Sequence, residues 1–223
     1  MFSKEFKITS YHIPLLFPIV NIISYEKSKN KLKLDLILFN SYGFFRSFLF
    51  TLFLVYTLFM GLEIEIKTGY IPGAIGRVAE LHGKYYHKYW GFSSFFEAKV
   101  ATELSEFIIR YNQSRDCFWS ALLDAEIEGS ITIDGLHAEE GGAHLRWYIV
   151  SDAIRGKGVG NQLIQRAVQF CKERKFKKVF LWTFEGLDPA RHLYEKFGFK
   201  LVEQRRGNQW GKEVQEQRFE LIL

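Results

Sequence analysis

The sequence predicts an α/β (α+β) domain of about six or seven strands and about four helices, preceded by an apolar N-terminal extension. From residue 62 onward, strand-like segments with period-two alternation take turns with segments whose apolar residues recur at helical spacing. A glycine-rich turn stands between one such strand and the next helix. Residues 1–60 have a different composition. We therefore divide the chain into an apolar, basic extension (residues 1–60) and a folded domain (residues 61–223).

The composition is that of a folded protein with one well-packed core. The chain has 223 residues, of which 48% are hydrophobic and 17% aromatic, and this excludes a disordered protein. Most of the net charge of +5 belongs to residues 1–60, which hold seven Lys or Arg and three Asp or Glu, whereas the rest holds 23 and 22. A duplex-binding domain needs a clustered basic face, so we expect no nucleic-acid partner. The oligomeric state is left open.

The two cysteines, Cys117 and Cys171, lie far apart in the sequence, each among apolar neighbours. Their number and spacing fit neither a disulfide framework nor a zinc site. We expect two buried structural thiols in a reducing compartment, and hence a cytoplasmic protein without a bound metal.

The extension contains two kinds of apolar segment. Asn21–Tyr25 and Lys31–Phe39 flank the polar turn Lys27–Asn30, and their alternation predicts a β-hairpin. The run Ser47–Leu62 has 16 residues without a charge, whereas a spanning helix usually needs about 20. Counted from the preceding aromatic residues, the run approaches that length, so residues 44–62 are a candidate membrane contact that would make the protein membrane-associated.

The charge distribution conflicts with a single membrane span. Basic residues precede the run, so the positive-inside rule would place the folded domain on the side opposite the cytoplasm. Three alternatives remain open. The run lies in the membrane interface or packs on the domain, it pairs with Ile13–Ser24 as a re-entrant hairpin, or residues 1–59 are dispensable because Met60 precedes the first strand of the domain. A cleaved signal peptide is not expected, because the run lies too far from the N-terminus.

The elements of the domain follow from apolar periodicity and from capping residues. Strands are expected at Leu62–Thr68, Phe118–Leu122, Ile127–Ile133, Ala143–Val150, Lys178–Phe184, near Phe199–Gln204 and near Glu213–Leu223. Helices are expected from Pro72 to near Gly91, after a cap at Ser93 or Ser94, from near Val159 to Cys171, and from the cap Asp188 to Gly198.

The segment Val150–Gly160 has the features of an anion-binding turn. Gly156, Gly158 and Gly160 let a ligand approach the backbone without a Cβ in the way. The helix that follows directs free N–H groups and the positive end of its dipole toward the turn. Arg155 adds a guanidinium suited to phosphate. The pattern predicts a diphosphate site.

Two blocks of sequence together resemble the GNAT (general N-acetyltransferase) superfamily. Arg155–Gly160 matches the pattern Gln/Arg-x-x-Gly-x-Gly/Ala, and Ala190–Phe199 matches Ala-x-x-Leu-Tyr-x-x-x-Gly-Phe. The blocks lie about 35 residues apart, with a helix and a strand between them. The resemblance covers about residues 62–223. It implies a mixed, strongly twisted sheet with a V-shaped split beside the strand that ends at Val150.

The resemblance also implies binding of acyl-CoA, usually acetyl-CoA, and acyl transfer to an amine. Backbone groups of Tyr148, Ile149 and Val150 would pair with the pantetheine arm. The amides that would hold the pyrophosphate are those of Arg155, Gly156, Lys157, Gly158, Val159 and Gly160. Tyr194 stands at the family's general-acid position, and a phenol is a suitable proton donor to a thiolate. The alternative for Tyr194 is an aromatic residue that only packs on the sheet.

The sequence indicates the general base less clearly than the general acid. Some members of the family carry a Glu at the position of His144, where a neutral imidazole could take the proton of the amine. The alternative is a histidine without a role, and Glu139 or Glu140 of the preceding loop could serve instead. Strand alternation predicts one face formed by His144, Arg146 and Tyr148, and another formed by Leu145, Trp147 and Ile149.

The acceptor pocket is expected between the first two helices and the loops 135–142 and 207–212. The aromatic residues over 85–92 could line a site for a flat or cationic amine. One departure from the family pattern is Leu187, at a position where an Asn often helps bind the cofactor arm. The leading hypothesis is an N-acetyltransferase that transfers acetyl directly to a small-molecule or peptide amine. The alternatives are a non-catalytic CoA-binding regulatory module and a membrane-associated protein whose extension carries the role.

Overall fold

The computed structural model describes residues 21–26, 31–36 and 64–223. The chain divides into two units, Met1–Met60 and Gly61–Leu223. In the first unit, β1 (Asn21–Glu26) pairs antiparallel with β2 (Lys31–Leu36), in agreement with the predicted hairpin. The predicted membrane contact at 44–62 lies outside the described residues. Among the helices within the described ranges, none is long and apolar enough to cross a bilayer.

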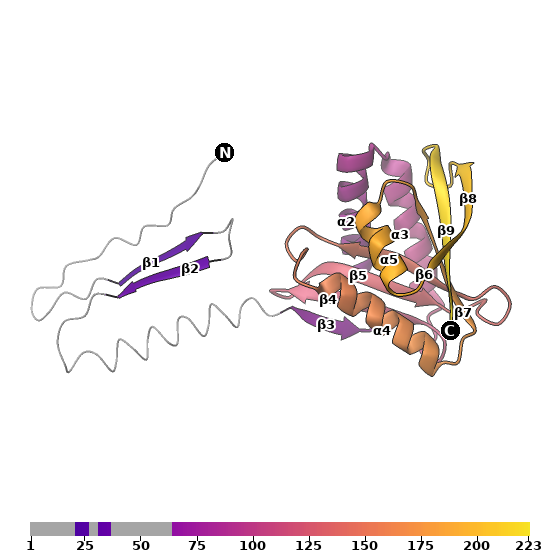
Figure 1. The fold of residues 1–223 in the computed structure, drawn as a ribbon, viewed down its shortest axis with the longest axis horizontal. Coiled ribbons are helices and arrows are strands. Elements are labelled where there is room, and N and C mark those ends of the chain that lie inside the picture. Colours follow the sequence, from indigo (N-terminus) through magenta and orange to yellow (C-terminus); the bar gives the residue numbers. More distant parts are fainter. Residues whose placement is uncertain (1–20, 27–30, 37–63) are drawn as a thin grey trace, which may run out of the picture. The chain divides into compact units, whose positions relative to one another are not determined.

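In the second unit, seven strands form one sheet in the order β3-β4-β5-β6-β7-β9-β8 (Figure 1). Only β6 and β7 pair in parallel, and the other neighbours pair antiparallel. This sheet confirms the predicted mixed architecture. The strands are β3 (Glu65–Thr68), β4 (Cys117–Leu123), β5 (Glu126–Asp134), β6 (Ala143–Val150), β7 (Lys178–Phe184), β8 (Lys200–Gly207) and β9 (Val214–Ile222).

Four helices flank the sheet, namely α2 (Ala74–Trp90), α3 (Ser94–Ile109), α4 (Val159–Glu173) and α5 (Asp188–Lys196). The hydroxyl of Ser93 caps α3 by accepting from the N–H of Phe95 at 3.4 Å. The predicted cap of α5 is wrong by one residue. Leu187 is the N-cap and makes no side-chain cap bond, and Asp188 lies in the first turn, where a carboxylate still favours the helix dipole.

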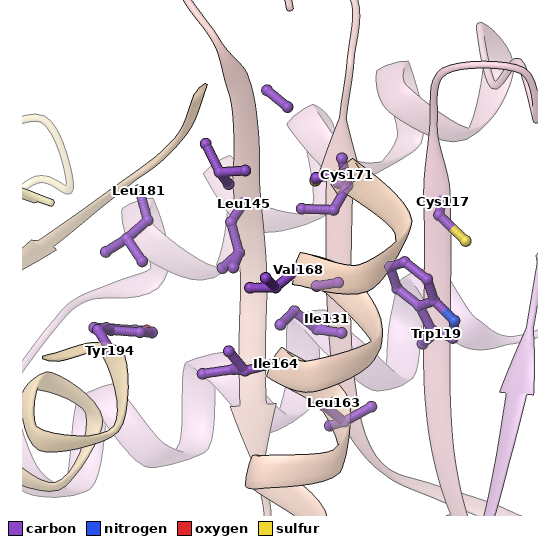
Figure 2. Close-up of a cluster of buried hydrophobic side chains, with 14 of the residues drawn as sticks. Cys117, Trp119, Ile131, Leu145, Leu163, Ile164, Val168, Cys171, Leu181 and Tyr194 are labelled. Carbon is purple, nitrogen blue, oxygen red and sulfur yellow. The ribbon is translucent and has the colours of Figure 1, made fainter. Parts of the chain in front are cut away.

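The helices lie on opposite faces of the sheet, so the domain has two hydrophobic clusters (Figure 1). One cluster joins α4 and α5 to the sheet, and Figure 2 shows Leu163, Ile164 and Val168 of α4 pointing at the strands. The second cluster joins α2 and α3 to the opposite face. Cys117 and Cys171 belong to the first cluster, and burial raises the pKa of both thiols to about 12. Both are therefore packed, unreactive thiols, as predicted.

A β-bulge interrupts β6 and overturns the predicted strand faces. The register shifts from Ser130 opposite Ile149 to Thr132 opposite Arg146, so β6 carries one extra residue, and Trp147 has a positive φ of 46°. Arg146 and Trp147 consequently lie on the same face, with the guanidinium 4.1 Å from the indole centroid. Trp147 packs in the α2–α3 cluster.

Beyond the bulge, the side chains of β6 have changed faces. Tyr148 packs against the α4–α5 cluster together with Leu145, instead of lying beside His144 and Arg146 as predicted. Simple alternation fails here because the inserted residue reverses the side-chain direction of every residue that follows it.

The parallel strands β6 and β7 separate almost as soon as they meet. Their ladder contains only the pairs Ala143–Val179 and His144–Phe180. From Leu145 to Val150, no pairing joins β6 to β7, so the sheet opens beside this part of β6. This opening is the predicted V-shaped split, and its backbone edge is available to an extended ligand.

Candidate active site

The glycine-rich turn follows β6 and leads directly into α4. Gly156 and Gly158 both have φ of 79°, in the left-handed region that glycine adopts without strain. The N–H of Gln162 donates to the Gly158 carbonyl at 3.2 Å and begins the helical ladder. No hydrogen bond in the described chain uses the preceding amides, those of residues 158–161. These free N–H groups lie at the start of α4, an arrangement suited to binding an anion.

Gly160 allows a close approach between α4 and β6. A Cβ at this position would lie 2.4 Å from the hydroxyl of Tyr148 and 3.5 Å from Leu193 of α5. The Nζ of Lys196 in α5 also donates to the side chain of Asn161 at 2.7 Å. The start of α4, the end of β6 and the helix α5 therefore meet at one point, beside the split in the sheet.

Arg155 is held by its own turn. Its Nη1 lies 2.5 Å from Asp152 Oδ1, and its Nη2 donates to the Val150 carbonyl at 3.2 Å. The guanidinium lies 5.4 Å from the ring centroid of Tyr85 on α2. The side chain is about half exposed, so its charge faces the solvent side of the turn, together with the exposed Lys157.

A cavity of about 360 Å³ passes through the split in the sheet. It reaches the α2–α3 face through His82, Tyr86 and Phe96, and the α4–α5 face through Leu181 and Tyr194. The remaining lining residues come from α3, β6, β7 and the loop before β9: Lys99, Val100, Glu103, His144, Leu145, Arg146, Trp147, Tyr148, Trp182, Thr183, Phe184, Gln209 and Trp210.

The observed lining corrects part of the predicted pocket. The first two helices and the loop at 207–212 contribute, as expected, but no residue of the loop 135–142 does. Glu139 and Glu140 are exposed and lie away from this cavity. The turn 155–160 does not line the cavity either, and the two meet through Tyr148, whose hydroxyl approaches Gly160.

Tyr194 is buried where the cavity meets α5. Its ring lies 6.0 Å from that of Tyr148, and 6.1 Å from both Phe199 and Phe219. Burial raises the pKa of Tyr194 well above 10.0, and the neighbouring Tyr148 and Tyr86 add to the shift. The phenol is consequently protonated at neutral pH. Tyr194 both packs in the core and lines the cavity, so the two readings of this residue are compatible.

His144 lies at the opposite end of β6 from the turn and stacks on Phe180, with the ring centroids 4.3 Å apart. Burial lowers its pKa to about 3, and the guanidinium groups of Arg146 and Arg218 also disfavour its protonated form. Protonation of this imidazole would place a positive charge beside two guanidinium groups, which disfavours His144 as a proton acceptor. The geometry therefore weakens the predicted role of His144.

The charged side chains that line the cavity form one group. Glu103 accepts from Lys99 Nζ at 2.5 Å and from Arg146, whose Nη1 also lies 3.8 Å from Asp134. Asp134 is bound in turn by both terminal nitrogens of Arg110. Within the lining itself, Lys99 and Arg146 oppose Glu103 alone, since burial keeps the histidines neutral. The cavity wall carries a surplus positive charge.

Among the described residues, no group of three or more His, Cys, Asp or Glu side chains is arranged to hold a metal. The family model described as the Acetyltransferase (GNAT) family matches residues 77–199, more than half of the chain. The chain belongs to the GNAT family of acetyltransferases. The match contains the turn, the bulged strand and Tyr194, which are the parts that meet at the split.

Individual relatives are distant. Human N-acetylaspartate synthetase is 25% identical over 148 residues, which cover 66% of this chain and 49% of that protein. The chain spans about half the length of the N-acetylaspartate synthetases that it matches. An acetyltransferase from Streptococcus agalactiae has the same fold, with a TM-score of 0.55, 20% identity, and 72% and 98% of the two chains covered.

A structure from Salmonella typhimurium that contains acetyl-CoA also shares this fold. It has a TM-score of 0.55 and 12% identity, and it covers 72% of this chain and 94% of its own. At such identity the likeness shows the fold alone.

The structure adds cavity residues that the sequence did not mark. His82, Lys99 and Glu103 lie on the helices α2 and α3, where they have the spacing of ordinary helix residues. The aromatic run at 85–92 did indicate this region, but only Tyr86 of that run lines the cavity. The other three residues could have been predicted only by knowing which face of each helix lies toward the split.

Proposed function

We propose that this GNAT protein is an acetyl-CoA-dependent N-acetyltransferase. The observation that carries the proposal is the continuity between the turn and the cavity. Free amides at the start of α4 adjoin the unpaired edge of β6, which leads along the split to a buried tyrosine. One extended ligand with a diphosphate at one end and a reactive group at the other would fit this path.

The residues present fit acetyl-CoA. The amides of residues 158–161 would hold the pyrophosphate, in place of the predicted set 155–160, because the N–H groups of Arg155 and Lys157 already donate to the carbonyls of Ser151 and Ile154. Gly160 lets the start of α4 approach the Tyr148 hydroxyl, which a Cβ there would block. The edge of β6 from Tyr148 to Val150 would bind the pantetheine amides, although Val150 already shares its carbonyl with Arg155. When bound, acetyl-CoA supplies the activated acetyl group. The cavity would shield it from water.

Tyr194 would act as the proton donor to the departing sulfur. Its burial keeps the hydroxyl protonated, so that a proton is available when the thiolate forms beside it. Its neighbours Phe199 and Phe219 fix the ring, so the hydroxyl does not have to be reoriented during the reaction.

The acceptor would be an amine that also carries a carboxylate. Lys99 and Arg146 give the lining a surplus positive charge, and the buried Nε2 of Gln209 has no hydrogen-bond partner in the described chain. A carboxylate would compensate both. N-acetylaspartate synthetases among the relatives make an amino acid with carboxylates a natural first acceptor to test. This charge balance replaces the expectation of a flat or cationic amine.

The experiment is calorimetric titration of the full chain with acetyl-CoA, followed by acetylation assays with matched acceptor pairs. Each pair contains an amino acid and its uncharged carboxamide. We expect acetyl-CoA binding and turnover of the acid over the amide. Lys99→Met should raise the KM for the acid about tenfold, the cost of one charge-assisted hydrogen bond, and leave the amide unchanged. No binding of acetyl-CoA would refute the proposal.

The same assay separates an enzyme from a CoA-binding regulatory module. In an enzyme, Gly158→Trp should abolish cofactor binding and Tyr194→Phe should reduce turnover. A regulatory module would bind acetyl-CoA, lose binding with Gly158→Trp, and have no turnover for Tyr194→Phe to reduce.

A further inference from the structure

His82 is a buried histidine of α2 that lines the cavity. Its side chain is 5% exposed, and it lies on the α2–α3 face of the split. The ring stacks near Tyr86 at 6.1 Å between centroids and contacts Phe96 at 6.4 Å in a tilted arrangement. These two aromatic rings pack beside the imidazole of a residue that lines the cavity.

The hydrogen bonds of His82 determine which nitrogen carries its proton. Nδ1 lies 2.8 Å from the carbonyl oxygen of Val78, one turn earlier in α2. A carbonyl can only accept, so Nδ1 must be the donor. A neutral imidazole has a single N–H, and Nε2 is therefore an unprotonated acceptor. No hydrogen bond in the described part of the chain occupies Nε2.

The surroundings of His82 keep it neutral without placing a cation against it. Burial lowers its pKa to about 4, and the Val78 carbonyl is the only other contributor. His144 differs, because Arg146 and Arg218 oppose its protonation directly. The other titratable groups that line the cavity with His82 are Tyr86, Lys99, Glu103, Arg146, Tyr148 and Tyr194.

We propose that Nε2 of His82, and not His144, accepts the proton of the acceptor amine. This inference rests on the proposed acetyltransferase function. The lone pair of the neutral amine forms the new C–N bond to the acetyl carbon, and the N–H proton passes to Nε2. The C–S bond breaks with its electron pair on sulfur, and the Tyr194 hydroxyl protonates that sulfur. One proton enters the protein at His82 and one leaves at Tyr194, so a return transfer through solvent restores both groups.

The kinetic test compares matched histidine variants of the full chain. In His82→Asn the side-chain amide can still donate to the Val78 carbonyl, but no atom can act as the base. We expect kcat to fall about 100- to 10,000-fold, the usual range for a general base, with the KM for acetyl-CoA unchanged. His87→Asn is the control, because His87 on the same helix also contacts a backbone carbonyl, that of Phe92 at 2.9 Å, and does not line the cavity.

Chemical rescue distinguishes a proton acceptor from a residue that only packs. His82→Ala should regain activity when imidazole is added, with a rescue that increases with the fraction of neutral imidazole. His87→Ala should show no such response. A wild-type rate in His82→Asn, or loss of activity without rescue in His82→Ala, would overturn the assignment.

A second readout requires neither turnover nor bound acetyl-CoA. Long-range proton–nitrogen NMR of the full chain at pH 7 should show His82 neutral, with the proton on Nδ1. A proton on Nε2, or a charged ring, would overturn the inference even if the enzyme is active. If acetyl-CoA does not bind or no amine is acetylated, the proposed function fails first and the role of His82 fails with it.

Discussion

The turn 155–160 and the cavity are two halves of one site built from different parts of the polypeptide. The turn presents backbone amides from consecutive residues, and its glycines matter because they leave space. The cavity presents side chains from three helices (α2, α3 and α5), from the strands β6 and β7, and from the loop before β9. A substitution in the turn should therefore act through sterics and on cofactor binding, whereas a substitution in the cavity should act through chemistry and on turnover.

The largest expected effect belongs to the cavity. Tyr194→Phe removes the hydroxyl and keeps the ring among Phe199 and Phe219. We expect kcat to fall about 100- to 10,000-fold, because the sulfur loses its proton donor, with little change in the Kd for acetyl-CoA. Stopped-assay turnover and calorimetric binding measure the two quantities. A large loss of binding with unchanged kcat would assign Tyr194 to packing and would remove the proposed division between the two halves.

A substitution in the turn should instead affect stability and cofactor binding more than turnover. Gly160→Val places side-chain atoms where a Cβ alone would lie 2.4 Å from the Tyr148 hydroxyl. We expect a loss of about 1–3 kcal/mol in the free energy of unfolding from overpacking, together with weaker acetyl-CoA binding. Denaturant unfolding and calorimetry give both values.

Gly76→Ala provides the steric control for that prediction. Gly76 lies inside α2, and a Cβ there would meet no atom within 4 Å. This substitution should raise the free energy of unfolding by up to about 1 kcal/mol, because alanine favours a helix over glycine. If Gly160→Val is as harmless as Gly76→Ala, the close approach at the turn is not required.

A pH dependence of stability is also expected to arise in the cavity. His82 and His144 have pKa values of about 4 and about 3, below the ordinary 6.5 that they have when unfolded. Between these values the unfolded chain binds more protons, so stability falls as the pH is lowered from about 6.5 toward 4. Each histidine should contribute roughly 1 kcal/mol per pH unit in this window.

Unfolding by denaturant at pH 7, 6 and 5 measures this dependence. His82→Asn should have a shallower slope than the wild type. Equal slopes for the two proteins would mean that His82 is not held neutral by burial.

Much of the fold follows from local sequence. The limits of β6 and β7 agree with the predicted segments, because both are short, rich in aromatic and β-branched residues and bounded by glycine or polar residues. The turn was also predictable. Its glycines and the helix start are neighbours in sequence, so their geometry depends on local backbone preferences. The family assignment followed from two such local blocks, Arg155–Gly160 and Ala190–Phe199.

The cavity depended on contacts between segments far apart in the chain. The bulge at Trp147 reversed the faces of β6, and alternation alone could not reveal it, because the extra residue exists only relative to the partner strand β5. His144 was placed by strand position, but only the fold shows that it stacks on Phe180 and that burial and two guanidinium groups disfavour its protonated form.

The sequence by itself determined the order of elements, the anion-binding turn and the family, since each depends on residues that are neighbours in the chain. Only the tertiary structure decided which side chains face the split and what protonation state each one has. It placed His82, Lys99 and Tyr194 around one cavity from three different helices. Burial and neighbouring charges are properties of the folded protein, and they set the pKa values on which the proposed chemistry depends.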